Sequence, residues 1–369
     1  MKIIATKENL QYGINTVQKA VSTKNTIPVL SGIRLKAVDN KLYMAATDLE
    51  IGIECFVAVQ VLEEGEIVLP ARQFSELVRR LPDTKIAINY IDSIIGVEIK
   101  YNDAEVNIKG WPGDEFPVIP DLEEGEYHFE INSTLFKNMV KQTVFAASSD
   151  ESRPIFTGAL LEIEENDFKL ITTDTHRLAL RSSKGNIIKN NNINLIIPAK
   201  ALAEVSRIIQ EDDENIQIKG NNNQICFKSS DTLLISRLID GRFPDYRQVI
   251  PDKFSTVIKI KTKDLQETVE RANLFSGEKD GTSVIRLKIE NGYLNISSKS
   301  DLGKVDENIP IFVEGEDIEI SFNARYILDV LKVLESEDLK FSLTGPLSPG
   351  VIKSGNHDNY TYLILPLRN

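Results

Sequence analysis

Short stretches in which apolar and polar residues alternate recur along the whole chain, for example at residues 86–90 (IAINY), 94–100 (IIGVEIK) and 257–261 (VIKIK). A period of two is typical of half-buried strands. Between them lie six stretches with helical apolar spacing, at residues 7–24, 72–81, 133–147, 199–210, 263–275 and 324–335. Strands outnumber helices too heavily for an alternating parallel fold, so the pattern predicts an antiparallel α+β fold.

The strand pattern repeats along the chain. Residues 27–32 (IPVLSG) precede an apolar strand, a turn at Asp39-Asn40 and a second strand that ends in Thr47-Asp48. Residues 153–158 (RPIFTG) begin the same series, which turns at Asn166-Asp167 and ends in Thr173-Asp174. A third copy, at residues 282–299, turns at Asn291-Gly292 but lacks the final Asp. Such self-similarity indicates tandem copies of one structural unit.

The helices repeat in the same way. In each copy one helix has an apolar residue ten positions after an alanine, namely Ala71, Ala199 or Ala324, and a second helix opens each copy, at Leu10, Leu135 and Leu265. Each copy therefore contains two helices and about eight strands. Proline and acidic residues close the first two copies and mark linkers. We predict three domains, at residues 1–125, 126–253 and 254–369.

The composition fits a multidomain globular protein. The chain has 369 residues, of which 41% are hydrophobic, and a formal charge of −12. That charge argues against a broadly basic surface for nucleic acid. No apolar run approaches the ~18 residues of a membrane span, and the polar N-terminus does not resemble a signal peptide. The widely separated Cys55 and Cys226 predict buried free thiols in a reducing cytoplasm.

Candidate catalytic residues are few. The repeated Thr-Asp pair stands at a strand end, where an Asp most often accepts backbone N–H bonds in a turn. Residues 173–178 (TDTHRL) add His176 and Arg177 in the second copy only. No motif for nucleophilic, phosphate or metal chemistry accompanies them. We predict a binding scaffold without a catalytic residue, metal or cofactor. The alternatives are an α+β hydrolase or transferase that uses Asp174, His176 and Arg177, and a repeat scaffold with no role on DNA.

The charge is unevenly distributed. The six helical stretches carry more Lys and Arg than Asp and Glu, whereas the strands and loops are strongly acidic. If the helices share one surface, phosphate meets a mildly positive face, and such contacts carry no sequence information.

The chain resembles the DNA polymerase III beta subunit, the bacterial sliding clamp, over essentially its full length. The motifs that carry the resemblance are, in order, residues 47–50 (TDLE), 69–72 (LPAR), 173–178 (TDTHRL), 240–247 (DGRFPDYR), 326–331 (YILDVL) and 362–368 (YLILPLR). The resemblance implies a head-to-tail homodimer that forms a ring of six domains around double-stranded DNA, with helices lining the hole. It implies a processivity factor that tethers the replicative polymerase, and the clamp loader as a further partner.

The resemblance also implies a hydrophobic cleft between the second and third domains that binds short peptides. The matching positions are Phe156, Thr173, Thr175, His176, Arg177, Leu178, Pro244, Val249, Asn323, Tyr326, Leu347, Leu363, Ile364, Leu365, Pro366, Leu367 and Arg368. From the residues alone, the C-terminal run could form an apolar pocket with a polar rim beside Tyr326, but an ordinary final strand is the favoured interpretation. This chain departs from the family pattern at three cleft positions. Family members can have Arg where this chain has Gln248, and Met where it has Leu365 and Leu367. These differences imply a shifted peptide preference.

Two further sets of residues follow. We expect eight basic residues to face DNA. The resemblance supplies the loop residue Lys24, and the charge of the helical stretches supplies Arg72, Arg79, Arg80, Lys137, Lys141, Lys200 and Arg207. Three domains form only an arc, so closure needs a second chain. We expect Val106 and Ile108, on an edge strand, to meet Leu274 and Phe275 of the partner. The alternative is that all four belong to the internal core.

Overall fold

The computed structural model divides into two compact units, each with its own sheets and helices. Unit 1 comprises Met1–Thr134 and Glu204–Leu238, and unit 2 comprises Leu135–Ala203 and Ile239–Asn369. The structure describes residues 1–22, 27–120, 122, 125–164, 167–184, 193–210, 213–279, 282–355 and 357–368.

The α-helices fall in the six predicted stretches, but several end earlier than predicted. Their bounds are α1 Lys7–Val17, α2 Ala71–Arg80, α3 Ser133–Thr143, α4 Ala199–Ile208, α5 Thr262–Leu274 and α6 Ala324–Leu331. The prediction for residues 7–24 was too long, because α1 tightens into a 3-10 turn at Gln18–Ala20 and the backbone is extended at Val21. A similar turn, Val144–Ala146, follows α3. Such turns are common at helix ends.

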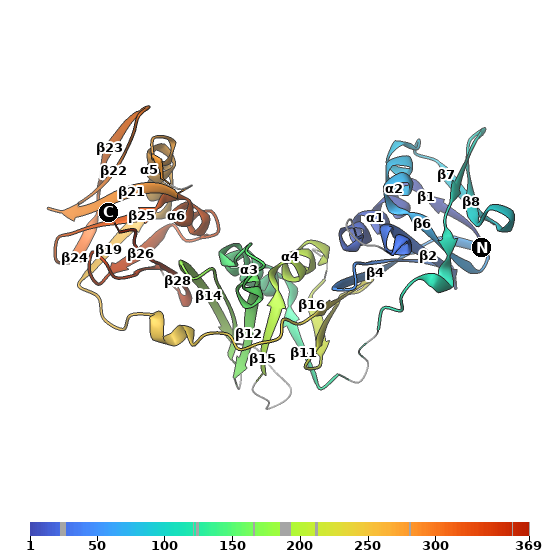
Figure 1. Ribbon diagram of the computed structural model, residues 1–369, viewed down its shortest axis with the longest axis horizontal. Helices are drawn as coiled ribbons and strands as arrows, with labels where there is room; N and C mark the ends of the chain where they lie inside the picture. Colours follow the sequence, from blue (N-terminus) through green and yellow to red (C-terminus); the bar gives the residue numbers. More distant parts are fainter. Residues whose placement is uncertain are drawn as a thin grey trace. The chain divides into compact units, whose positions relative to one another are not determined.

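Local chemistry explains where the helices begin and which face they bury. The Thr6 side chain caps α1 by accepting a hydrogen bond from the Asn9 amide, and Asn323 caps α6 in the same way. These caps satisfy amides that have no partner within the helix. The buried face of α1 carries Leu10 and Ile14, one helical turn apart. Helix α1 packs beside α2 in unit 1, and α5 beside α6 in unit 2 (Figure 1).

Two smaller sheets lie one in each unit. Within the described residues of unit 1 the order is β5 (Gln60–Glu63), β1 (Lys2–Thr6), β7 (Lys85–Ile91), β8 (Gly96–Tyr101) and β9 (Ala104–Lys109). In the described part of unit 2 the order is β20 (Glu278–Lys279), β21 (Thr282–Glu290), β22 (Tyr293–Ser300) and β23 (Gly303–Pro310), with β25 (Ile318–Asn323) paired to β21. Strands β9 and β23 therefore form edges of these sheets.

Two larger sheets each combine strands of two predicted domains. The sheet of unit 1 runs, among described residues, β10 (Trp111–Pro112), β6 (Gly65–Pro70), β2 (Gly32–Val38), β3 (Lys41–Thr47), β4 (Ile51–Ala58), β18 (Thr232–Arg237), β17 (Gln224–Lys228), β16 (Asn215–Gly220) and β11 (Tyr127–Asn132). The sheet of unit 2 runs, over the described ranges, β15 (Ile193–Pro198), β12 (Gly158–Glu164), β13 (Asp167–Thr173), β14 (Arg177–Lys184), β28 (His357–Ile364), β27 (Gly350–Ser354), β26 (Asp338–Leu343), β19 (Thr256–Lys261) and β24 (Phe312–Gly315).

The strand pairing confirms the antiparallel fold, because the paired strands among the described residues all run antiparallel to one another. The predicted turns at Asp39-Asn40 and Asn291-Gly292 are also confirmed. All four residues have positive φ, as two-residue hairpin turns require. Two strand pairings, β4 with β18 and β14 with β28, each join a strand of one predicted domain to a strand of the next.

Two predictions from composition can be compared with the structure. Cys55 and Cys226 are free and buried, as predicted. Among the described residues, no helix is long and apolar enough to cross a membrane.

Candidate functional site

The repeated Thr-Asp pair builds the same turn in both copies. In the first copy, the Asp48 carboxylate accepts hydrogen bonds from the amides of Glu50 and Ile51, and the Thr47 hydroxyl donates to the Ile51 carbonyl. In the second copy, the Asp174 carboxylate accepts hydrogen bonds from the amides of His176 and Arg177, at 2.9 and 3.0 Å. The prediction that this Asp serves turn geometry is confirmed.

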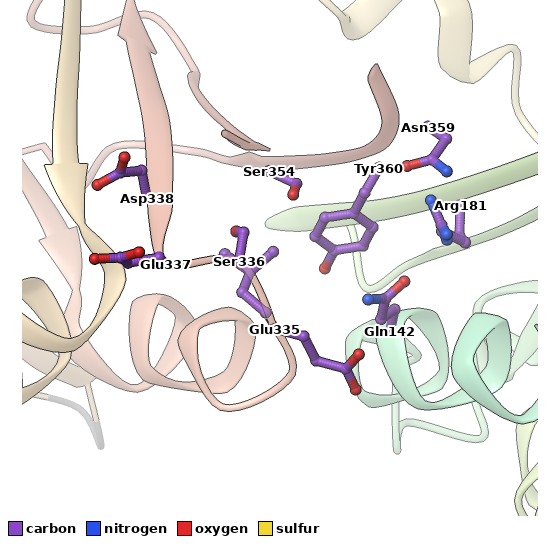
Figure 2. Close-up of a pocket in the computed structure, with 10 residues that line it drawn as sticks. Gln142, Arg181, Glu335, Ser336, Glu337, Asp338, Ser354, Asn359 and Tyr360 are labelled. Carbon is purple, nitrogen blue, oxygen red and sulfur yellow. The ribbon is translucent and has the colours of Figure 1, made fainter. Parts of the chain in front are cut away.

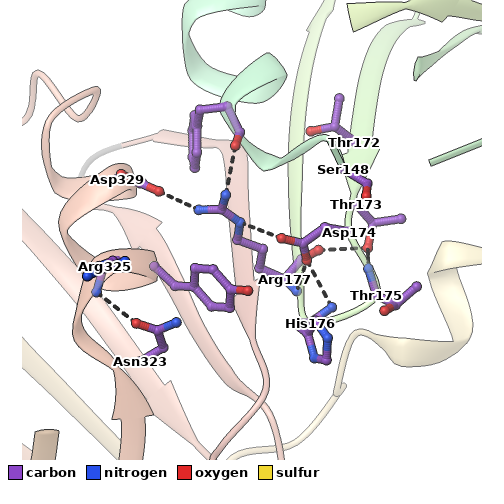
Figure 3. Close-up of polar contacts among 12 residues, drawn as sticks. Ser148, Thr172, Thr173, Asp174, Thr175, His176, Arg177, Asn323, Arg325 and Asp329 are labelled. Atoms are coloured by element: carbon purple, nitrogen blue, oxygen red, sulfur yellow. Dashed lines mark hydrogen bonds and ion pairs between the residues drawn. The ribbon is translucent and has the colours of Figure 1, made fainter. Parts of the chain in front are cut away.

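The second copy adds a cation to this turn. The Nε of Arg177 donates to Asp174 at 2.9 Å, one terminal nitrogen donates to Asp329 at 2.6 Å, and the other donates to the carbonyl of Phe145 at 2.9 Å (Figure 3). The guanidinium also stacks on Tyr326, with 4.3 Å between its central carbon and the ring centre. Arg177 therefore ties β14 to the 3-10 turn that follows α3 and to α6, across the junction of the predicted second and third domains.

The electrostatics of Arg177 agree with a structural role. Burial lowers the pKa of Arg177, but the neighbouring Tyr362, Asp329 and Asp174 outweigh burial, so the net pKa is raised. The oxygens of Asp174 are engaged by two backbone amides and by this guanidinium, which favours a fixed carboxylate over a proton shuttle. The His176 side chain is exposed, and no cluster of His, Cys, Asp or Glu suited to a metal occurs among the described residues.

An apolar pocket of about 250 Å³ lies directly beside this turn. Its walls come from the 3-10 turn Pro154–Thr157, the β13–β14 turn, the loop that leads into the 3-10 turn Tyr246–Val249, and the end of β28. It brings together ten of the predicted cleft residues, namely Phe156, Thr173, Thr175, His176, Arg177, Leu178, Pro244, Val249, Leu363 and Leu365. The C-terminal run is a strand only as far as Ile364, and the next residue already lines the pocket.

The other predicted cleft residues lie outside this lining. Asn323 caps α6, and Tyr326 stacks on Arg177, which itself lines the pocket. Ile364 is fully buried in the core of unit 2. The Leu367 amide donates to the Ser321 carbonyl, which directs the tail toward β25. Leu347, Pro366 and Arg368 are exposed or half-buried without lining the pocket.

Three lining residues, Phe243, Asp245 and Tyr246, were missed by the sequence prediction. The Tyr246 hydroxyl donates to the buried carboxylate of Glu162 at 2.9 Å. Burial, strengthened by this hydrogen bond, raises the pKa of Tyr246. Burial alone raises the pKa of Glu162, but hydrogen bonds from Lys169 and Tyr246 lower it overall. The signal was present in residues 240–247 (DGRFPDYR), a motif of the resemblance from which only Pro244 was assigned to the cleft.

The basic residues predicted to face DNA lie mostly on exposed helical positions. Arg79 and Arg80 of α2 both pair with Glu76, and Lys141 of α3 pairs with Glu335 at 3.3 Å. The other residues of this set that the structure describes are Arg72 on α2, Lys137 on α3, and Lys200 and Arg207 on α4. Lys24 lies outside the described residues.

The predicted interface residues occupy surface positions. Val106 and Ile108 are half-buried on β9, at the edge of its sheet. Leu274, the last residue of α5, is 73% exposed. The half-buried Phe275 lies against Gly303, where β23 begins. The alternative that all four residues belong to the internal core is therefore wrong for Leu274.

Three protein families match consecutive parts of the chain. They are described as DNA polymerase III beta subunit, N-terminal domain (residues 1–120), central domain (130–245) and C-terminal domain (247–368). The beta sliding clamp of Bacillus subtilis (strain 168) is 37% identical over 379 residues, which cover 100% of both chains. That of Halalkalibacterium halodurans is 36% identical over 383 residues, again with 100% of each chain covered.

Solved structures agree with the sequence relatives. The DNA polymerase sliding clamp from Bacillus subtilis has a TM-score of 0.95 at 37% identity, and the match covers 100% of this chain and 99% of that one. A sliding clamp from Pseudomonas aeruginosa, solved bound to griselimycin, has a TM-score of 0.94 at 28% identity, with 100% of both chains covered.

These matches confirm the predicted resemblance, the three tandem α+β domains and a role outside catalysis, and nothing in them supports the enzyme alternative. The boundaries at residues 1–125, 126–253 and 254–369 stay a prediction. The chain belongs to the DNA polymerase III beta subunit family, the family of the beta sliding clamps.

Proposed function

We propose that two copies of this chain close head to tail into a ring around duplex DNA and tether the replicative polymerase to it. The observation that carries this proposal is the full-length match, in order, to the three domains of one processivity factor. The basic positions on α2, α3 and α4 support a helical lining that meets phosphate without reading sequence. Because these contacts between the ring and DNA are weak, the clamp can slide along the duplex.

Encirclement makes a topological prediction. Loaded by a clamp loader, the protein should remain on closed circular DNA and leave when that DNA is linearised, because only a free end releases a closed ring. Retention is measured by gel filtration of the loaded circles before and after cutting. Without a loader, binding should be weak and should fall steeply with salt. Salt-resistant binding to one DNA sequence would contradict the proposal.

We further propose that the apolar pocket of unit 2 receives short peptides of the polymerase, the clamp loader and other clamp-binding proteins. Its side chains are mainly apolar, and Thr173, Thr175 and His176 supply a polar rim. A concave apolar site with few polar groups suits a peptide anchored by one or two hydrophobic side chains. Gln248 donates to Asp245 at 2.9 Å and brings no charge to this rim, which supports a peptide preference different from that of relatives with Arg there.

The pocket predicts which truncation weakens peptide binding. Leu365→Ala removes a wall of the pocket, so it should weaken polymerase peptides by ~1–3 kcal/mol if Leu365 is a main anchor. Fluorescence anisotropy with a labelled polymerase peptide measures the loss. Leu62→Ala is the matched control, because Leu62 is a half-exposed leucine on β5 of unit 1. Equal affinities for the two variants would show that the pocket has been misassigned.

For the ring itself, we propose that β9 of one chain meets β23 and the end of α5 in the partner. Both strands are sheet edges among the described residues, and an unpaired edge readily accepts another strand. Val106 and Ile108 would then face Leu274 and Phe275.

We also propose a cytoplasmic location, which the free, buried Cys55 supports.

A further inference from the structure

A second, polar pocket of about 340 Å³ lies in unit 2, away from the apolar one. It is lined by Gln142 of α3, Arg181 of β14, Tyr360 of β28 and the segment that follows α6, which includes Ser336 (Figure 2). Arg181 and Tyr360 pair across the β14–β28 ladder, and Arg177 pairs with Ile364 at its other end. The two pockets therefore lie at opposite ends of the same strand pair.

Four buried polar atoms of this pocket have no hydrogen-bond partner in the described structure. They are Gln142 Oε1, Arg181 Nε, Ser336 Oγ and the Tyr360 hydroxyl. Tyr360 is only 1% exposed, and burial raises its pKa well above the usual value, so the hydroxyl stays protonated and able to donate. Buried polar groups are normally hydrogen-bonded, and leaving one unpaired costs about 1–3 kcal/mol. Four such atoms around one cavity indicate an occupant.

The orientation of these groups defines the chemistry of the occupant. Gln142 donates its amide to the Val333 carbonyl, which leaves its oxygen as an acceptor without a partner. Arg181 Nε is a donor, and the hydroxyls of Ser336 and Tyr360 can donate as well. The occupant must therefore accept several hydrogen bonds on one group and donate one from a neighbouring group.

The charges around the pocket permit an anionic group. Three lining residues are acidic, but Glu335 is paired with Lys141 at 3.3 Å, Asp338 is paired with Lys259 at 3.1 Å, and Glu337 is exposed to solvent. Arg181 forms no ion pair with a carboxylate among the described residues, and burial lowers its pKa although the guanidinium remains charged. Arg181 is thus the cation of this pocket that is available to a ligand.

We propose that this pocket binds a carboxylate that has an N–H donor beside it, the chemistry of a peptide's C-terminal residue or of a free amino acid. The carboxylate accepts from Arg181, Tyr360 and Ser336, and the N–H donates to Gln142. A water molecule takes up ~30 Å³ and ligand sites start near ~300 Å³, so the volume suits a small ligand better than a single water.

The test uses the full-length protein and saturation-transfer NMR titrations. N-acetylglycine represents the peptide terminus and glycine the free amino acid, while the methyl ester of N-acetylglycine keeps the shape without the charge. We expect saturable binding of at least one acid and at least tenfold weaker binding of the ester. The acid that binds more tightly identifies the source of the ligand, a peptide terminus or a free amino acid.

Two variants connect the binding to these atoms. Tyr360→Phe and Arg181→Gln should each weaken the bound acid at least tenfold, and Tyr360→Phe should fold normally because its hydroxyl has no partner to lose. Tyr293→Phe, on an exposed position of β22, is the matched control and should bind like the wild type. If neither acid binds saturably, or if Tyr360→Phe binds as well as the wild type, the proposal is overturned.

Discussion

Replacement of Arg177 by Ala should destabilise unit 2 by roughly 3–5 kcal/mol, because removing one partner of a buried ion pair leaves the other charge uncompensated. The side chain of Arg177 is 10% exposed and that of Asp174 is 13% exposed, so water replaces little of what is lost. The carbonyl of Phe145 and the face of Tyr326 lose their partner as well. Peptide binding should fall in parallel, since Arg177 lines the pocket.

Denaturant unfolding with a probe placed in unit 2 measures this effect. Arg286→Ala is the matched control, because the Arg286–Glu319 pair of the same unit is about half exposed and such pairs contribute only ~0–1 kcal/mol. Arg177→Lys should recover little, since one ammonium cannot reproduce the fork that reaches two carboxylates and a carbonyl. Equal stabilities of the Arg177 and Arg286 variants would contradict the proposed role of Arg177.

Features set by local chemistry were predictable from the sequence. The Thr-Asp turn could be predicted because its hydrogen bonds join residues at most four positions apart. The β-hairpin at Asn291-Gly292 could be predicted because these residues tolerate positive φ. The joining of β4 to β18 and of β14 to β28 depends on strands far apart in the chain, and no local pattern specifies such a partner.

The candidate site shows the same division between local and distant effects. Leu363, Ile364 and Leu365 were predicted as one apolar run, yet successive side chains of a strand point to opposite faces. Leu363 and Leu365 therefore line the pocket, while Ile364 enters the core. Tyr246 was missed because its anchor, Glu162, lies on the distant strand β12.

The proposed dimer interface consists of residues that the folded chain leaves at its surface. In unit 1, β9 ends its sheet with Val106 and Ile108 half-buried. In unit 2, the exposed Leu274 stands at the end of α5, beside the edge strand β23. Leu302, at the turn between β22 and β23, is 87% exposed. Apolar side chains gathered at a sheet edge are typical of a surface that a partner covers.

Replacement of both Leu274 and Phe275 by Ala should convert the dimer to a monomer. Removing two apolar anchors at the centre of an interface costs ~2 kcal/mol or more for each hot spot, which raises the dissociation constant by orders of magnitude. Sedimentation velocity measures the change, and circular dichroism should stay native because Leu274 makes little contact within its own chain. Phe312→Ala, which truncates an exposed aromatic residue on β24, should leave the dimer intact. A double variant that remains dimeric, or one that unfolds, would refute this position of the interface.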